Sequence, residues 1–222
     1  MYYEVIYALE TLETEADCAD LLKDVQLPRL FDEDRETLET ELAEEEVCLA
    51  LQSLHSGMPE GPNSLPAQLF MMNKVEKHML GMFQEVRKEG GLPVDQRAAT
   101  IVVIPKIGKP PTECGSYRPM SLLNMEVKVL MKGFATRLQM VFTKITQLNQ
   151  YGSMPLRSMR LNLRRLEGVL HTTNIPDAEQ VALCSLDAKM VFDCVEPYIF
   201  ATFERLGFVC GFVAGSDFFT GK

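Results

Sequence analysis

Long hydrophobic runs are missing from this sequence. A membrane-spanning helix needs roughly 18 consecutive apolar residues, and the most apolar stretch here, 206–215, is interrupted by three glycines. The first residues, Met-Tyr-Tyr-Glu, lack the basic and apolar regions of a secretory signal and do not resemble an Arg-rich transit peptide. The sequence therefore predicts an intracellular protein with no membrane partner.

Cysteine pairs and the short motifs of several enzyme classes are also missing. The six cysteines form no C-x-x-C pair and have no histidine at ligand spacing, which argues against a zinc site or a disulfide framework and favours buried free thiols. The nucleotide-binding loops G-x-G-x-x-G and G-x-x-x-x-G-K-[ST] do not occur, nor do G-x-S-x-G and H-E-x-x-H. These absences exclude the common hydrolase and nucleotide-loop functions.

The overall composition is typical of a folded globular protein. The 222 residues allow one domain of ordinary size, or about one and a half. Apolar residues make up 46% and charged residues 24%, which excludes a collagen-like or wholly disordered chain. We therefore expect a sizeable hydrophobic core.

The charges are distributed unevenly along the chain. Residues 1–60 carry 17 acidic and 3 basic side chains, whereas residues 61–222 carry 14 acidic and 19 basic ones. Within the second part, residues 97–165 hold 12 lysines and arginines but only two acids, Glu113 and Glu126. A basic segment of this size predicts nucleic-acid binding. The alternative is that these cations only form the solvated faces of amphipathic helices, and charge alone does not decide between the two.

Apolar residues at helical spacing predict three long helices. The three segments are residues 34–54, 65–88 and 124–148. We expect Ser64 and Asn124 to cap the second and third helices, and Gly90-Gly91 to end the second. The expected core positions are Leu38, Leu42, Val47, Leu51 and Leu54; Leu69, Met72, Val75, Met79, Phe83 and Val86; and Val127, Met131, Phe134, Leu138, Phe142 and Ile145. Lys128, Lys132, Arg137 and Lys144 are expected on other sides of the third helix.

Two β-branched, apolar stretches predict strands. Residues 98–104 read as a buried strand that Pro105 ends, and the proline-rich stretch 105–119 reads as a loop. Residues 181–186 read as a second strand, and Asp187 follows at its carboxyl end, where α/β proteins form their sites. A further helix is expected between Pro197 and Gly207, and the Gly-, Pro- and Asn-rich stretch 56–63 is interpreted as a functional loop or a boundary.

Three stretches together carry a family resemblance. They are Ile101-Val102-Val103-Ile104-Pro105-Lys106, Ser116-Tyr117-Arg118-Pro119-Met120-Ser121-Leu122-Leu123-Asn124 and Asp187-Ala188-Lys189-Met190-Val191-Phe192-Asp193. They resemble the reverse transcriptases of non-LTR (LINE-type) retrotransposons, whose pattern reads A-T-I-V-x-I-P-K-x-G-K-x-P-x-x-C-x-x-Y-R-P-I-S-L-L-N followed by S-L-D-A-x-x-A-F-D. The match is nearly unbroken over residues 99–124, and a weaker one extends from 27 to 212.

The resemblance implies an α/β fold (α+β, polymerase-like) with mostly helical fingers and an incomplete palm sheet of a right-hand polymerase. It divides the chain into an acidic N-terminal helical segment, 1–60, a basic fingers-like region, 61–180, and the start of the palm, 181–222. The implied partners are an RNA template, a DNA primer and deoxynucleoside triphosphates. Residues 97–165 are expected to bind nucleic acid weakly.

The resemblance also implies roles for single residues. Asp187 matches the first catalytic carboxylate and, with the backbone carbonyl of Ala188, would bind Mg²⁺. Lys106 and Arg118 match positions that neutralise triphosphate or template phosphate, although they could be plain surface charges. Phe192 matches the ring that lies under the nucleotide sugar, although it could be a core residue. Arg157 is retained from the segment that grips the template.

Several departures from the family pattern weaken the case for activity. The family's G-P-D-G loop reads Gly-Pro-Asn-Ser at 61–64, and the template-grip segment 150–157 retains little beyond Gly152 and Arg157. The family's Tyr-x-Asp-Asp hairpin would lie beyond Lys222, and the chain contains no Asp-Asp pair. We therefore expect a truncated reverse transcriptase that is inactive alone. The alternative is a non-catalytic module of transposon origin that binds nucleic acid or another protein.

Overall fold

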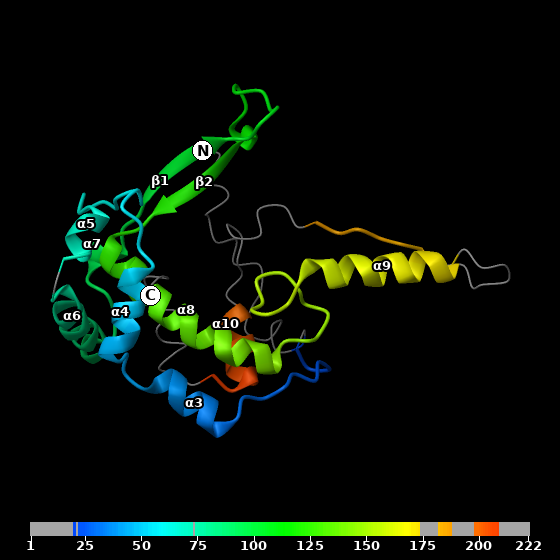
Figure 1. Cartoon of the computed structure of the whole chain (residues 1–222), viewed down its shortest axis with the longest axis horizontal. Coiled ribbons are helices and arrows are strands. Elements are labelled where there is room, and N and C mark those ends of the chain that lie inside the picture. Colours follow the sequence, from blue (N-terminus) through cyan, green and yellow to red (C-terminus); the bar gives the residue numbers. More distant parts are fainter. Residues whose placement is uncertain (1–19, 21, 73, 174–181, 188–197, 209–222) are drawn as a thin grey trace.

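The computed structural model describes residues 20, 22–72, 74–173, 182–187 and 198–208. Helices dominate these residues, and the sheet found among them has two strands (Figure 1). The expected mixture of helix and strand is therefore confirmed. The elements are α3 (Asp32–Glu39), α4 (Glu44–Gln52), α5 (Ala67–Phe70), α6 (Val75–Glu89), α7 (Val94–Arg97), β1 (Thr100–Pro105), η1 (Cys114–Ser116), β2 (Tyr117–Leu122), α8 (Met125–Ile145), α9 (Met159–Thr173) and α10 (Tyr198–Leu206).

The single helix expected over 34–54 is wrong, because the structure contains two helices there. Helix α3 ends before Thr40 and α4 begins after Ala43, and both of these flanking residues have extended backbone with ψ of 146° and 157°. The Glu46 carboxylate accepts the N–H of Ala43 at 2.8 Å, which stabilises the start of α4. The apolar stripe itself is predicted correctly, since all five of its residues are buried.

The helix expected over 65–88 is also interrupted. It forms α5 and α6, which are separated by Lys74 in the left-handed region with φ of 72°. Ser64 does not cap it, because α5 starts only after Pro66. Gly90, with φ of 72°, ends α6 as predicted. The break turns Leu69 and Met72 to solvent, whereas the expected core residues Met79, Phe83 and Val86 are buried.

The strand expected at 98–104 forms β1, but its predicted burial is wrong. β1 pairs with β2 in an antiparallel hairpin that stands out from the helices in Figure 1, and all six β1 residues are exposed. The β-branched residues therefore favour extended backbone here without being packed inside. Part of the predicted loop 105–119 is β2 itself, in which Pro119 pairs with Val103.

Helix α8 is the central element of the described structure. Its first half packs with α4, α5 and α6 around one hydrophobic cluster, and its second half packs with α3 and α10 around another. The first cluster contains Leu42, Val47, Ala50, Leu51, Leu54, Ala67, Phe70, Met79, Phe83, Val86, Leu92, Met125, Val127, Val129 and Leu130. The second contains Leu30, Leu38, Val141, Leu206 and Phe208. Residues from both 1–60 and 61–180 thus contribute to the first cluster.

The end of the described chain contains the expected helix but not the expected strand. Residues 182–187, the described part of the expected strand, form no strand and are exposed; Val181 lies outside the described residues. Helix α10 ends at Gly207, with φ of 94°, as predicted, and Pro197 lies outside the described residues. The N–H of Leu30 donates to the carbonyl of Leu206 at 2.8 Å, which ties α10 to the N-terminal part.

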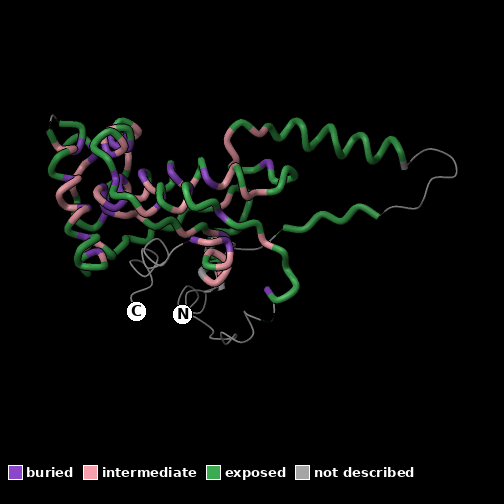
Figure 2. The backbone as a smooth tube through the Cα atoms, turned by 90° about the horizontal axis from the view of Figure 1, so that it is seen from below, coloured by how far each residue is buried: buried purple, intermediate pink, exposed green. Residues whose placement is uncertain are grey.

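Helix α9 is a feature that the sequence did not predict. It extends away from the other helices in Figures 1 and 2, and every one of its residues with described burial is exposed. The thiols of Cys48, Cys114 and Cys184 are not buried either, contrary to expectation. No helix in the described part of the chain combines the length and apolar character needed to cross a membrane.

Candidate functional site

The hairpin places two of the predicted phosphate-binding residues on one face. Arg118 pairs with Ile104 in the register, and the N–H of Lys106 donates to the Ser116 carbonyl at 2.8 Å, which continues the ladder by one pair. Because side chains alternate along a strand, Lys106 and Arg118 point to the same side of the ribbon. This side is open, since the Arg118 side chain is exposed and makes no hydrogen bond or ion pair with a described residue.

The tip of the hairpin is held by contacts within the loop. The Lys106 ammonium donates to the Gly115 carbonyl at 2.8 Å, and the Tyr117 hydroxyl donates to the Pro111 carbonyl at 2.9 Å. Lys109 lies exposed in the same loop, and Glu113 is the one acidic residue between Arg97 and Leu122. The hairpin therefore presents several cations and a single carboxylate.

A second motif of the resemblance packs where β2 leads into α8. The Asn63 N–H donates to Asn124 Oδ1 at 3.1 Å, and the Asn63 amide donates to the Glu126 carboxylate at 3.2 Å. Asn124 occupies the N-cap position as predicted, but its side chain holds the 61–64 loop instead of capping its own helix. The structure thus brings together the loop at 61–64 and the motif at 116–124.

Two cations of the basic segment are neutralised by the acidic N-terminal part. Arg137 forms an ion pair with Glu46 at 2.5 Å, and Lys144 forms one with Asp34 at 2.5 Å. Arg137 is only 4% exposed, so its expected place on a side of α8 away from the core is wrong. The hydrogen bond from Arg137 holds the pKa of Glu46 below its ordinary value of 4.5, although burial acts in the opposite direction.

Sequence reasoning missed the buried pair of Arg137 and Glu46. The one available signal was the position of Glu46 three residues after Ala43, the spacing of a helix-capping glutamate. That spacing indicates a helix start inside the segment 34–54, but it does not identify Arg137 as the partner. The two residues are 91 positions apart, so only the packing of α4 on α8 reveals their contact.

The Arg157 side chain forms hydrogen bonds with backbone carbonyls of the same chain. Its guanidinium donates to the carbonyls of Thr146 at 3.1 Å, Gln147 at 2.5 Å and Gln150 at 2.8 Å. These carbonyls follow the end of α8, so Arg157 holds the turn there. Its predicted role in gripping a template stays a prediction.

Of the residues predicted to bind metal and nucleotide sugar, the structure describes Asp187 alone. Asp187 is exposed, and the segment 182–187, orange in Figure 1, lies apart from β1 and β2. Ala188 and Phe192 lie outside the described residues. No cluster of three or more metal-ligating side chains exists among the residues that the structure describes. Among the described residues, Asp187 therefore has no carboxylate partners of the kind that Mg²⁺ requires for nucleotidyl transfer, and its role as a metal ligand stays a prediction.

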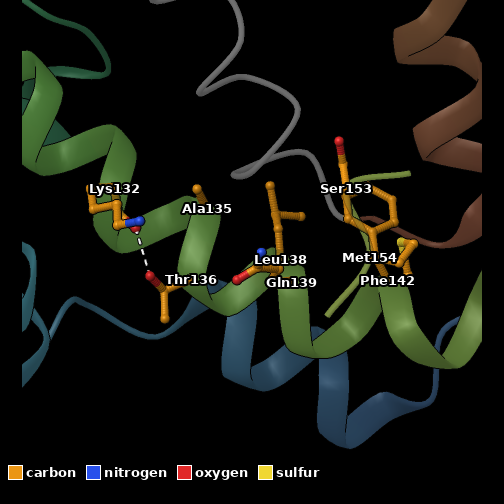
Figure 3. Close-up of a pocket in the computed structure, with 8 residues that line it drawn as sticks. All are labelled: Lys132, Ala135, Thr136, Leu138, Gln139, Phe142, Ser153 and Met154. Carbon is orange, nitrogen blue, oxygen red and sulfur yellow. Dashed lines mark hydrogen bonds between the residues drawn. The ribbon is translucent and has the colours of Figure 1, made fainter. Parts of the chain in front are cut away.

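A shallow groove of about 270 Å³ lies between α8 and the turn at 153–154 (Figure 3). Its lining combines apolar side chains, Leu138, Phe142 and Met154, with the single cation Lys132. The Thr136 hydroxyl donates to the Lys132 carbonyl at 2.9 Å, which leaves this hydroxyl bound to its own helix. The groove lining contains no acid–base pair or activated nucleophile, so it offers no catalytic chemistry.

The comparisons with known proteins point to a transposon. No protein-family model matches the chain. The chain is similar to the "Transposon TX1 uncharacterized 149 kDa protein" of Xenopus laevis, with 25% identity over 215 residues. This similarity covers 96% of the chain but only 16% of the frog protein, so the chain spans about one sixth of that protein's length. The comparison supports an origin of this sequence in a transposon.

Proposed function

We propose that this chain is a segment of a non-LTR retrotransposon reverse transcriptase, comprising fingers and the start of a palm. In this proposal the β1–β2 hairpin binds phosphate groups of the RNA template, the DNA primer or an incoming deoxynucleoside triphosphate. The observation that supports it best is the placement of Lys106 and Arg118 on one open face of the hairpin. Both residues come from the stretch 99–124 that carries the resemblance.

The chemistry of this face suits phosphate. An arginine guanidinium donates paired hydrogen bonds to phosphate oxygens, and a lysine ammonium adds a compact positive charge. Such contacts are independent of base sequence and weaken as salt concentration rises. We therefore expect binding without sequence preference.

Catalysis of nucleotidyl transfer at Asp187 is a separate question from phosphate binding at the hairpin. Two divalent cations need several convergent carboxylates, and Asp187 has no such partners among the described residues. This observation favours a second candidate function, a nucleic-acid-binding module of transposon origin without catalysis. Both candidate functions predict phosphate binding at the hairpin. Only the reverse transcriptase could synthesise DNA, and the non-catalytic module could not.

Binding is tested with the full chain and a fluorescently labelled single-stranded RNA, measured by anisotropy at several salt concentrations. The double variant Lys106→Ala/Arg118→Ala is compared with Lys77→Ala/Arg87→Ala, which removes the same two residue types from exposed positions on α6. Removal of two phosphate contacts is expected to lower the slope of log K against log salt by about 1.4. Equal losses in the two double variants would contradict a binding site on the hairpin.

Catalysis is tested by primer extension on an RNA template with Mg²⁺ and deoxynucleoside triphosphates. We expect no extension by this chain, because Asp187 stands without carboxylate partners among the described residues. Template-dependent incorporation that is lost in Asp187→Asn would overturn the non-catalytic candidate and establish the enzyme.

A further inference from the structure

Helix α9 carries an exposed apolar stripe that repeats at coiled-coil spacing. Met159, Leu163, Leu166 and Leu170 follow one another at intervals of four, three and four residues, which is the spacing of alternating d and a positions of a heptad. Their exposed fractions are 57%, 59%, 36% and 44%. A stripe of this kind is ordinarily buried against another helix.

The contacts of α9 with the preceding loop leave the stripe on a different side of the helix. Arg165 donates to Asn149 Oδ1 at 2.5 Å, and its guanidinium lies 5.6 Å from the centre of the Tyr151 ring. With about 100° between successive helical residues, Arg165 lies about 130° around the helix from the middle of the stripe. The side that contacts the preceding loop is therefore different from the side that carries the stripe.

We propose that α9 is a self-association element that pairs in antiparallel orientation with α9 of a second copy of this chain. In an antiparallel pair each d residue faces an a residue of the partner, so Met159 meets Leu170 and Leu163 meets Leu166. This arrangement is related by a twofold axis, so the same contacts form twice and the pair is closed.

The charges beside the stripe favour a second copy of α9 as the partner, and they favour the antiparallel orientation. Arg160 and Glu167 both occupy e positions, and e positions face each other in an antiparallel pair with this register. Each Arg160 would then meet Glu167 of the other copy, and two such pairs form per dimer. In a parallel pair Glu167 would instead face Asn162, and Arg160 would have no acidic partner.

Neither charged side chain has a competing partner among the described residues. The ion pairs found among the described residues involve neither Arg160 nor Glu167, and both side chains are exposed. The seam is only about 22 Å long, because α9 has 15 residues. We therefore expect a weak dimer, with a Kd on the order of 10 μM or higher.

Sedimentation velocity of the full chain over a concentration series tests the proposal. The chain is expected to shift from monomer to dimer as its concentration rises. Leu166→Asp is expected to keep the chain monomeric, because dimerisation would then have to bury a carboxylate in the seam. Leu161→Asp is the matched control, since Leu161 is 50% exposed on the side of α9 away from the stripe, and this variant is expected to dimerise normally.

A charge exchange tests the orientation. Arg160→Glu and Glu167→Arg are each expected to raise the Kd about tenfold, and the double variant Arg160→Glu/Glu167→Arg is expected to restore it. No α9 residue belongs to either hydrophobic cluster, so these variants are expected to fold, and circular dichroism checks this. A folded chain that stays monomeric up to millimolar concentration, or a dimer that the charge exchange does not rescue, would overturn the proposal.

Discussion

At the scale of single residues, Arg137 fills the gap between α3 and α4. Its guanidinium donates to both oxygens of the Glu46 carboxylate, at 2.6 and 2.5 Å, and to the carbonyl of Glu41 at 2.8 Å. It also donates to the carbonyl of Thr40, the last residue before the turn. A break in a helix leaves carbonyl groups without intrahelical partners, and Arg137 satisfies two of them.

We predict that Arg137→Met lowers the free energy of unfolding by roughly 3 kcal/mol. The substitution leaves the Glu46 carboxylate and two backbone carbonyls without their donor. The value is at the lower end for a broken buried pair because the Glu46 side chain is 30% exposed. Urea denaturation followed by circular dichroism measures it, and Lys132→Met, at an exposed α8 position, is the control.

The cost of Arg137→Met should also depend on pH. The pKa of Glu46 is lowered in the folded protein, so its stabilising contribution is complete above the ordinary value of 4.5 and is lost as pH falls through the folded value. The difference between the natural chain and the variant should therefore be largest near neutral pH and should shrink below about 4.5. A difference that stays constant to pH 3 would contradict the role assigned to this pair.

At the scale of elements, the 61–64 loop depends on a close approach to the start of α8. A Cβ atom added to Gly61 would lie 2.5 Å from both the backbone nitrogen and Oδ1 of Asn124. Asn124 is itself buried and accepts the hydrogen bond from Asn63, so it has little room to move. The loop therefore requires glycine at position 61 for steric reasons.

We predict that Gly61→Ala destabilises the protein by roughly 1–3 kcal/mol, because the methyl group displaces Asn124 and the loop. Thermal unfolding measures the loss. Gly57→Ala is the matched control in the same turn-rich stretch, since a Cβ at Gly57 meets nothing within 4 Å. Similar unfolding temperatures for the two variants would show that the 61–64 loop accommodates the methyl group without loss of stability.

The hairpin and the interrupted helices show which elements can be predicted locally. The run of β-branched residues at 101–104 predicts β1 because extended backbone suits these side chains. The breaks at Thr40 and Lys74 carry no glycine or proline signal, so the periodic stripes predict continuous helices there. The break before α4 forms where Arg137 from α8 supplies the missing donors.

At the scale of the whole molecule, the acidic N-terminal part belongs to the core. Val47 and Leu51 of α4 are buried in the same cluster as Met125 and Val127 of α8. The 17 acidic side chains of this part, against 3 basic ones, would oppose nucleic-acid binding by the basic segment 97–165. Two ion pairs and a shared apolar cluster show that it also holds α8 in place.

We predict that a chain lacking residues 1–60 loses cooperative thermal unfolding, because α8 would expose much of its apolar surface. Differential scanning calorimetry measures this loss. A sharp unfolding transition in the shortened chain would show that residues 61–222 fold without the acidic part.

The effect of the acidic charge on RNA binding is tested separately with the triple variant Glu33→Gln/Glu44→Gln/Glu45→Gln, which changes only exposed residues. This variant should bind RNA more tightly than the natural chain at low salt.

The sequence by itself determined the helix-rich composition, the apolar stripes, the helix ends at Gly90 and Gly207, and the β1 strand. These features follow from side-chain periodicity and backbone preference within a few residues. Only the tertiary structure decided that β1 is exposed, that α9 stands apart, and that Arg137 is buried rather than available to nucleic acid. Burial and ion pairing depend on contacts between residues far apart in the chain, and no local pattern reports them.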